Sequence, residues 1–352
     1  MPNTPTTRIL DAATNRATEG LRVVEDYARF ALDDAHLTQL AKNLRHDLAT
    51  ACAGLSQQDR HASRETQQDV GTTLTTPAES KREGPWEVCL ASLERTKQSL
   101  RSLEEYSKID SPKLSAQFES LRYQLYTLER TLTITQTSRL RLSNVRLCIL
   151  IDGQHSLESF KQLIANLLDA RVGMIQLRDK TLADRELLMR AQLLRSMFPR
   201  HKDAPLILIN DRPDIAAIAD ADGVHLGQDD MNVKNARSIV GPRKLIGIST
   251  HTIQQARTAV LDGANYLGAG PTFPSSTKPF DKFPGLDYLQ QLADEISLPT
   301  FAIGGIDAEN LEQVLATGTT RVAVSGAANE AKQLLKQLTE PSAPADGQPP
   351  LQ

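Results

Sequence analysis

The chain has 352 residues, of which 40% are hydrophobic and 24% are charged, and its formal net charge is −3. This length suggests two domains, at about 150 residues for each. The near-neutral balance excludes the basic surface of a nucleic-acid-binding protein, and the absence of any apolar run of about 18 residues excludes a membrane span. The three cysteines are odd in number and far apart, which argues against a disulfide framework and favours the cytoplasm.

Residues 1–142 have the apolar spacing of helices. The first apolar series follows a 3.6-residue period and consists of Ile9, Leu10, Ala13, Ala17, Leu21, Val24, Ala28 and Leu32. Further helices are expected over about residues 34–53, 86–107 and 112–138, and the polar residues 56–84 are expected to form a long loop. The pattern predicts an all-α N-terminal domain over residues 1–142.

One polar stripe on the first helix allows two interpretations. Asn15, Glu19, Arg22, Asp26 and Arg29 recur every three or four residues, opposite the apolar face. Such a stripe is typical of a solvated face with ion pairs between successive turns, and we favour that interpretation. The alternative is a polar pocket or a docking surface.

From residue 143 onward, short apolar runs alternate with amphipathic segments. The eight runs are Leu147–Asp152, Met174–Lys180, Pro205–Asn210, Gly223–Gly227, Leu245–Thr250, Tyr266–Pro271, Thr300–Gly305 and Arg321–Gly326. Runs that are apolar on both faces indicate buried parallel strands, and eight strand–helix units predict a (β/α)₈ TIM barrel over residues 143–338.

A doubly wound open sheet is the alternative fold, but the first strand lacks the glycine-rich turn of a dinucleotide-binding domain. Residues 339–352 have the composition of a disordered tail.

The chemistry of a TIM barrel is found at the carboxyl ends of its strands. Gln176, Arg178 and Lys180 alternate along the end of the second run, so we expect their side chains to point together into the barrel mouth. Asp211 follows the third run and Asp230 follows the fourth. Two carboxylates, with phosphate oxygens and water, are the ligands that Mg²⁺ prefers.

Cationic and glycine-rich segments complete this set. Arg178, Lys180 and Lys278 supply positive charge for a diphosphate, and Gly304-Gly305 offers backbone N–H groups to a second phosphate. No nucleophile–base pair is evident. The residues therefore predict transfer of an alkyl group from a metal-held diphosphate to a phosphorylated acceptor. His225 is expected to be a packed strand residue, Asp229 at most a helix cap, and the role of His251 is left open.

The strand-end motifs together resemble the thiamine-phosphate synthase family. They are QLRDK, ND, GVHLGQDD, GIST, GPTFPSSTK, AIGGI and VAVSGA, in that order over about residues 143–335. The resemblance implies a (β/α)₈ barrel that joins 4-amino-2-methyl-5-hydroxymethylpyrimidine diphosphate to 4-methyl-5-(2-phosphoethyl)thiazole. The products would be thiamine phosphate and pyrophosphate, formed in thiamine biosynthesis by a magnesium-assisted dissociative transfer.

The resemblance also implies residue roles. The pyrimidine diphosphate would be held by Gln176, Arg178, Lys180, Asn210, Ser249 and Lys278, of which Arg178, Lys180, Lys278 and Ser249 would be catalytic. The thiazole phosphate would be bound by Ser275, Ser276, Thr277, Gly305, Val324 and Ser325. Asp211 and Asp230 would bind Mg²⁺.

The N-terminal segment DAATNRATEGLRVVEDYARF resembles a helical extension that is fused to some of these synthases. Regulation, homo-oligomer formation, substrate channelling and a second activity are all open for it. Two alternatives to the synthase are considered. A thiazole tautomerase of the same superfamily should lack the diphosphate and metal residues, and a phosphate-sensing binding module would use the helical domain as its output.

Overall fold

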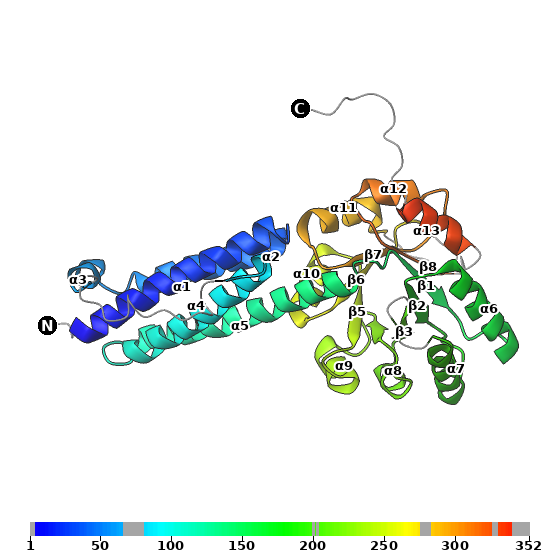
Figure 1. The fold of residues 1–352 in the computed structure, drawn as a ribbon, viewed down its shortest axis with the longest axis horizontal. Helices are drawn as coiled ribbons and strands as arrows, with labels where there is room; N and C mark the ends of the chain where they lie inside the picture. The colour runs from blue at the N-terminus through cyan, green and yellow to red at the C-terminus, as the bar shows by residue number, and fades with distance from the viewer. Residues whose placement is uncertain are drawn as a thin grey trace, which may run out of the picture. The chain divides into compact units, whose positions relative to one another are not determined.

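The structure, a computed structural model, describes residues 4–65, 81–198, 201, 204–274, 283–325 and 330–339 (Figure 1). Most of the expected loop and nearly all of the expected tail therefore lie outside the described residues. The chain divides into two compact units, Met1–Thr133 and Ile134–Gln352. None of the described helices is both long enough and apolar enough to cross a membrane.

The first unit is helical, as the apolar spacing predicts. Its helices are α1 (Thr4–Phe30), α2 (Ala35–Cys52), α3 (Gln57–Ala62), α4 (Pro85–Ser107) and the first part of α5 (Pro112–Arg141). Helix α3 was not expected, because its six residues contribute no buried side chain and so show no apolar period. It begins where the Ser56 side chain accepts a hydrogen bond from Asp59 N, which is an N-cap.

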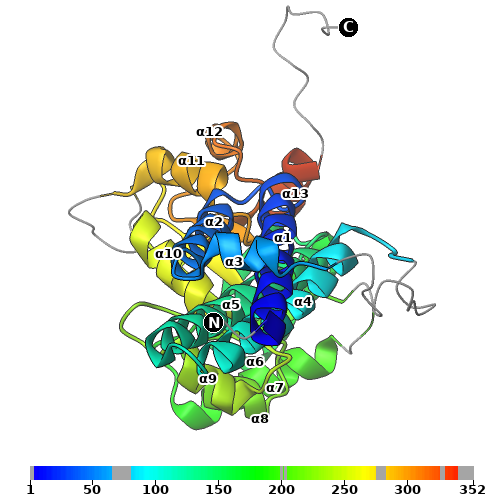
Figure 2. The ribbon, with the colours of Figure 1, turned by 90° about the vertical axis from the view of Figure 1, so that its left-hand side faces the viewer.

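Helix α1 packs against both α2 and α4 (Figure 2). Gly20 permits the close approach to α4, since a Cβ at this position would lie 2.2 Å from Thr96 Oγ1 and 3.0 Å from Ser92 O. Ion pairs also join helices of the unit, α5 to α4 and α2 to α1. Arg122 Nε donates to Glu104 Oε2 at 2.8 Å, and Arg45 Nε donates to Glu25 Oε2 at 2.7 Å.

The polar stripe of α1 is solvated. Asn15, Glu19 and Arg29 are exposed, and Arg22 lies 3.6 Å from the Asp26 carboxylate one turn away. This arrangement matches the favoured interpretation of a face with local ion pairs.

The second unit is a closed barrel of eight parallel strands in sequential order, which confirms the predicted (β/α)₈ fold. The strands are β1 (Leu147–Ile151), β2 (Met174–Leu177), β3 (Leu206–Asn210), β4 (Gly223–Leu226), β5 (Leu245–Thr250), β6 (Tyr266–Ala269), β7 (Thr300–Ile303) and β8 (Val322–Ser325). The helices are α6 (Leu157–Ala170), α7 (Asp184–Met197), α8 (Pro213–Ile218), α9 (Val233–Val240), α10 (Ile253–Asp262), α11 (Gly285–Glu295), α12 (Leu311–Ala316) and α13 (Ala331–Thr339).

Apolar side chains fill the barrel below its mouth. The buried members of this cluster are Leu142, Val145, Cys148, Met174, Leu208, Leu245, Tyr266, Phe301 and Ala323. Because successive side chains of a strand alternate between faces, the next inward positions along the same strands lie nearer the carboxyl ends. Gln176, Asn210 and Ser325 occupy such positions, whereas Leu150 and Ile303 are apolar.

The end of α5 is fixed to the opposite side of the barrel, beside residues that precede the strands. Asn265 Nδ2 donates to Ser138 Oγ at 3.1 Å, and Arg141 Nη1 donates to the carbonyl of Arg243 at 2.6 Å. Directly after the helix, Leu142 enters the apolar cluster. The last turns of α5 thus belong structurally to the barrel unit.

Candidate active site

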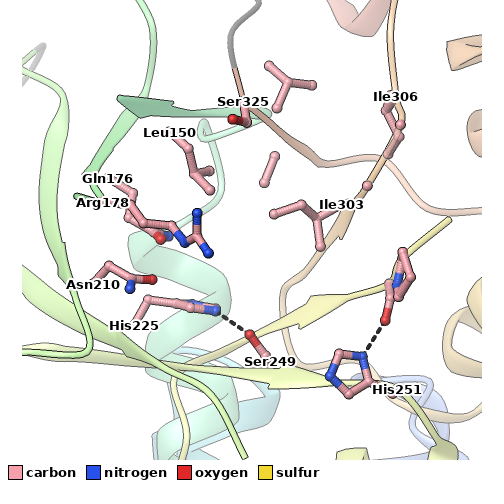
Figure 3. Close-up of a pocket in the computed structure, with 16 residues that line it drawn as sticks. Leu150, Gln176, Arg178, Asn210, His225, Ser249, His251, Ile303, Ile306 and Ser325 are labelled. Atoms are coloured by element: carbon pink, nitrogen blue, oxygen red, sulfur yellow. Dashed lines mark hydrogen bonds between the residues drawn. The ribbon is translucent and has the colours of Figure 1, made fainter. Parts of the chain in front are cut away.

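A cavity of about 330 Å³ opens at the carboxyl ends of the strands (Figure 3). Its lining consists of Leu150, Gln176, Arg178, Asn210, His225, Ser249, His251, Gly270, Pro271, Ile303, Gly304, Gly305, Ile306, Ala323, Val324 and Ser325. Figure 3 shows polar side chains of β2 to β5 along one side, with Ile303 and Ile306 on the other. The cavity therefore has a polar side and an apolar side.

Strand alternation places most of the polar side. Gln176 lies two residues beyond Met174, Asn210 two beyond Leu208, and Ser249 follows Gly247 in the same way. Arg178 comes directly after β2, and its backbone N–H donates to the carbonyl of Ile151 at 2.7 Å. The structure thus brings together these four side chains, as the sequence predicted.

Asp211 and Asp230 lie beside this polar side and face each other. Burial and the neighbouring Asp230 carboxylate raise the pKa of Asp211, although the nearby Lys180 ammonium opposes the shift. Lys180 Nζ lies 3.2 Å from Asp211 Oδ2, and Asp230 Oδ2 accepts a hydrogen bond from Gly227 N at 2.7 Å. Two adjacent carboxylates, one of which raises the pKa of the other, form an oxygen-ligand set suited to a divalent cation.

Asp179 organises the loop after β2, a role that the sequence analysis missed. Its carboxylate accepts hydrogen bonds from the backbone N–H groups of Gly153, Thr181 and Leu182, at 3.0, 2.8 and 3.0 Å. Partial burial acts in the opposite direction, but these hydrogen bonds lower the pKa of Asp179 to about 2. The signal available in the sequence was an Asp followed two residues later by Thr, which is typical of an Asx turn.

Gly304 and Gly305 form the part of the cavity wall that follows β7. Both have positive φ, 101° and 65°, which favours glycine. A Cβ at Gly305 would lie 2.8 Å from the carbonyl oxygen of Pro274. Asn310 Nδ2 donates to the carbonyl of Gly305 at 2.8 Å and holds this loop in place.

His225 is packed in its strand, as expected, but it also lines the cavity. It is 8% exposed, and burial lowers its pKa to about 4, so the ring is neutral near pH 7. Its Nε2 lies 2.9 Å from Ser249 Oγ, and its Nδ1 lies 2.9 Å from Tyr266 Oη. His251, whose role was left open, also lines the cavity and hydrogen-bonds through Nδ1 to the carbonyl of Gly270 (Figure 3).

The remaining predicted residues divide into three groups. Gly305, Val324 and Ser325 line the cavity, whereas Lys180, Asp211 and Asp230 lie outside its lining. Ser275, Ser276, Thr277 and Lys278 lie outside the described residues. Asp229 does not cap α9, because the Asn232 side chain accepts the capping hydrogen bond from Asn235 N at 2.9 Å.

A closed parallel barrel with polar side chains converging at the carboxyl ends of its strands is the architecture of a TIM-barrel enzyme. Residues 147–328 match the thiamine monophosphate synthase family, and residues 8–131 match the ThiD2 family. A thiamine-phosphate synthase from Rhodopirellula baltica is 46% identical over 330 residues, which are 91% of this chain and 87% of that protein. The chain is therefore an enzyme of the thiamine monophosphate synthase family.

A second relative also aligns with the helical unit, whereas a solved structure aligns with about half of the chain. A thiamine-phosphate synthase from Synechocystis sp. is 40% identical over 339 residues, which are 94% of this chain and 96% of that protein. Among solved structures, a thiamine phosphate pyrophosphorylase from Pyrococcus furiosus is 30% identical, with 56% of this chain and 97% of that chain covered and a TM-score of 0.49.

Proposed function

We propose that the chain is a thiamine-phosphate synthase. It would join 4-amino-2-methyl-5-hydroxymethylpyrimidine diphosphate to 4-methyl-5-(2-phosphoethyl)thiazole and release pyrophosphate. The observation that carries this proposal is the paired Asp211 and Asp230 carboxylates beside the cationic, polar side of the cavity. The named relatives, which align over nearly their whole length, support it.

The carboxylate pair fits Mg²⁺, since Asp230 already raises the pKa of Asp211 and a cation would relieve this repulsion. When bound, Mg²⁺ would neutralise negative charge on the diphosphate. Asp211 and Asp230 would hold the cation, and Lys180 is close enough to Asp211 to share the same anionic group of the substrate.

The residues of the polar side would bind the diphosphate and orient the pyrimidine. Arg178 presents a planar guanidinium with several donors, which suits two phosphate oxygens at once. Gln176, Asn210 and Ser249 offer neutral hydrogen-bonding groups for the ring and the diphosphate. By resemblance, Lys278 would add a third positive charge.

The opposite wall would receive the thiazole phosphate. Gly305, Val324 and Ser325 lie together on the cavity surface, and Ile303 and Ile306 provide apolar area for a ring (Figure 3). Ser275, Ser276 and Thr277 are proposed for the same phosphate from the family motif. A thiazole nitrogen is itself a nucleophile, so the transfer needs no side-chain nucleophile.

The cytoplasm is the proposed compartment, because Cys52, Cys89 and Cys148 are all free and buried. Burial is the main reason that the pKa of Cys89 is raised to about 12, so this thiol is unreactive near pH 7.

The direct test is to incubate the purified full chain with both substrates and Mg²⁺ and to measure thiamine phosphate and pyrophosphate. Equal amounts of the two products are expected, and omission of either substrate should abolish both. Binding of both substrates without product would favour the phosphate-sensing module. Conversion of a thiazole substrate in the absence of the pyrimidine would favour the tautomerase.

A further inference from the structure

Two buried rings lie in series beneath Ser249. Tyr266 is 2% exposed and His225 is 8% exposed, and their ring centroids lie 5.5 Å apart. Hydrogen bonds of 2.9 Å connect Tyr266 Oη to His225 Nδ1 and His225 Nε2 to Ser249 Oγ (Figure 3 shows the second). A hydrogen-bonded path thus runs from the barrel interior to the cavity.

Glycines at positions 247 and 268 leave space for these two rings. A Cβ at Gly247 would lie 2.0 Å from Tyr266 Cζ, and a Cβ at Gly268 would lie 2.9 Å from His225 Cε1. Gly247 pairs with Tyr266 in the register of β5 and β6. Any larger residue at Gly247 would displace the tyrosine ring and so break the path.

The direction of each hydrogen bond follows from the tyrosine. Among the described residues, the structure gives the Tyr266 hydroxyl one hydrogen-bond partner, which is His225 Nδ1. A buried O–H group that makes no hydrogen bond is costly, so the phenol donates and Nδ1 accepts. An imidazole whose Nδ1 accepts carries its proton on Nε2.

The same tautomer of His225 orients the Ser249 hydroxyl at the cavity. His225 Nε2–H donates to Ser249 Oγ, so the serine accepts on the side of the histidine. Its own proton is left to point toward the cavity that Ser249 lines. Gln228 Nε2 holds the backbone of the same residue by donating to the Ser249 carbonyl at 2.6 Å.

We propose that Tyr266 and His225 are positioning residues that fix the Ser249 hydroxyl as a hydrogen-bond donor into the cavity. The group of the substrate that meets Ser249 is therefore an acceptor, such as an unprotonated ring nitrogen of an aminopyrimidine. The identity of that substrate rests on the proposed function, whereas the order of the hydrogen bonds does not.

The first test is nitrogen NMR of the full chain with labelled histidine, without substrate. The His225→Gln variant identifies the His225 signals among the seven histidines. We expect a protonated Nε2 and an unprotonated Nδ1 that accepts a hydrogen bond. A proton on Nδ1 would overturn the inference.

The second test is a double-mutant cycle on kcat/KM for the pyrimidine diphosphate. Tyr266→Phe should lower kcat/KM about 3- to 10-fold in the natural background, and it should have no further effect in the Ser249→Ala background. Equal effects in both backgrounds would refute the coupling. Tyr288→Phe is the matched control, because Tyr288 is also buried and its hydroxyl donates to the Thr252 carbonyl at 3.2 Å.

The two tests separate the inference from the proposed function. A chain that forms no thiamine phosphate would contradict the proposed function, and the NMR measurement would then decide the order of the hydrogen bonds alone.

Discussion

Lys180 and Asp211 form an ion pair across two strand ends, with Nζ 3.2 Å from Oδ2. The lysine side chain is 59% exposed, whereas the aspartate is 24% exposed and also faces Asp230. One exposed ammonium compensates only part of the charge of two carboxylates. Asp211 and Asp230 together therefore retain negative charge that a further cation can neutralise.

Asp230→Asn should weaken the binding of Mg²⁺ by the Asp211 and Asp230 carboxylates. We expect the Mg²⁺ concentration for half-maximal activity to rise roughly tenfold or more, because affinity depends on the number of charged ligands. The measurement is a Mg²⁺ titration of the initial rate. Asp229→Asn removes the same charge from an exposed neighbour, and an equal shift in that variant would contradict the assignment.

Arg178→Lys should lower kcat/KM by about 100-fold, although the charge is kept. The lysine ammonium lacks the planar pair of donors that binds two phosphate oxygens together. Steady-state kinetics with the pyrimidine diphosphate measure the effect. Arg185→Lys, on the exposed face of α7, should remain within twofold of the natural enzyme. Full activity of Arg178→Lys would exclude bidentate binding by this residue.

Asp179→Asn should destabilise the barrel unit in a pH-dependent way. The pKa of Asp179 is lowered to about 2 in the folded chain, so its ionised form stabilises the fold above the unfolded pKa of about 3.9. That contribution is lost as the pH falls through about 2. We expect a loss of about 1 kcal/mol at pH 7, measured by denaturant unfolding, that shrinks toward zero in acid. A pH-independent difference would show that the charge is unimportant.

Gly247→Ala should be costly because the added Cβ would lie 2.0 Å from the Tyr266 ring. Overpacking of this kind costs about 1–3 kcal/mol. Gly173→Ala is the comparison, since its nearest contact would be Val145 Cα at 3.3 Å, where a small adjustment suffices. Denaturant unfolding of both variants should rank Gly247→Ala as the less stable, and the reverse order would contradict close packing of Tyr266 against Gly247.

Arg122→Leu should destabilise the helical unit by about 3 kcal/mol, because it removes the buried partner of Glu104. The two side chains are 10% and 4% exposed, and the hydrogen bond to Glu104 holds the pKa of Arg122 above its usual range. Lys108→Gln breaks the exposed pair with Glu105 and should cost less than about 1 kcal/mol. Thermal unfolding followed by helical circular dichroism compares the two, and similar losses would argue against a buried ion pair.

The sequence predicted the barrel well because buried parallel strands read as apolar runs with little ambiguity. Strand alternation predicted the inward position of Gln176, whereas Asn210 and Ser249, which also line the cavity, were expected from the resemblance. The short helix α3 escaped the periodic pattern, because none of its residues is buried.

The hydrogen bond between His225 and Tyr266 could not be predicted from the sequence, for a physical reason. The two residues lie on strands that are separated by β5, and their contact depends on the absence of side chains at Gly247 and Gly268. Neither glycine lies in a turn, so no local rule marked them. Asp179 was missed for a different reason, since most of its partners are backbone N–H groups and the Thr181 hydroxyl, which also donates to it, is only a weak local signal.

The attachment of the last turns of α5 has a practical consequence for any attempt to isolate the barrel. A fragment that starts at residue 143 would lack Leu142, which packs in the apolar cluster, and Ser138, which receives the Asn265 side chain. In such a fragment, the apolar cluster at this end of the barrel would be exposed to water. A self-sufficient barrel has to carry the final two turns of the preceding helix with it, beginning at about Ile134.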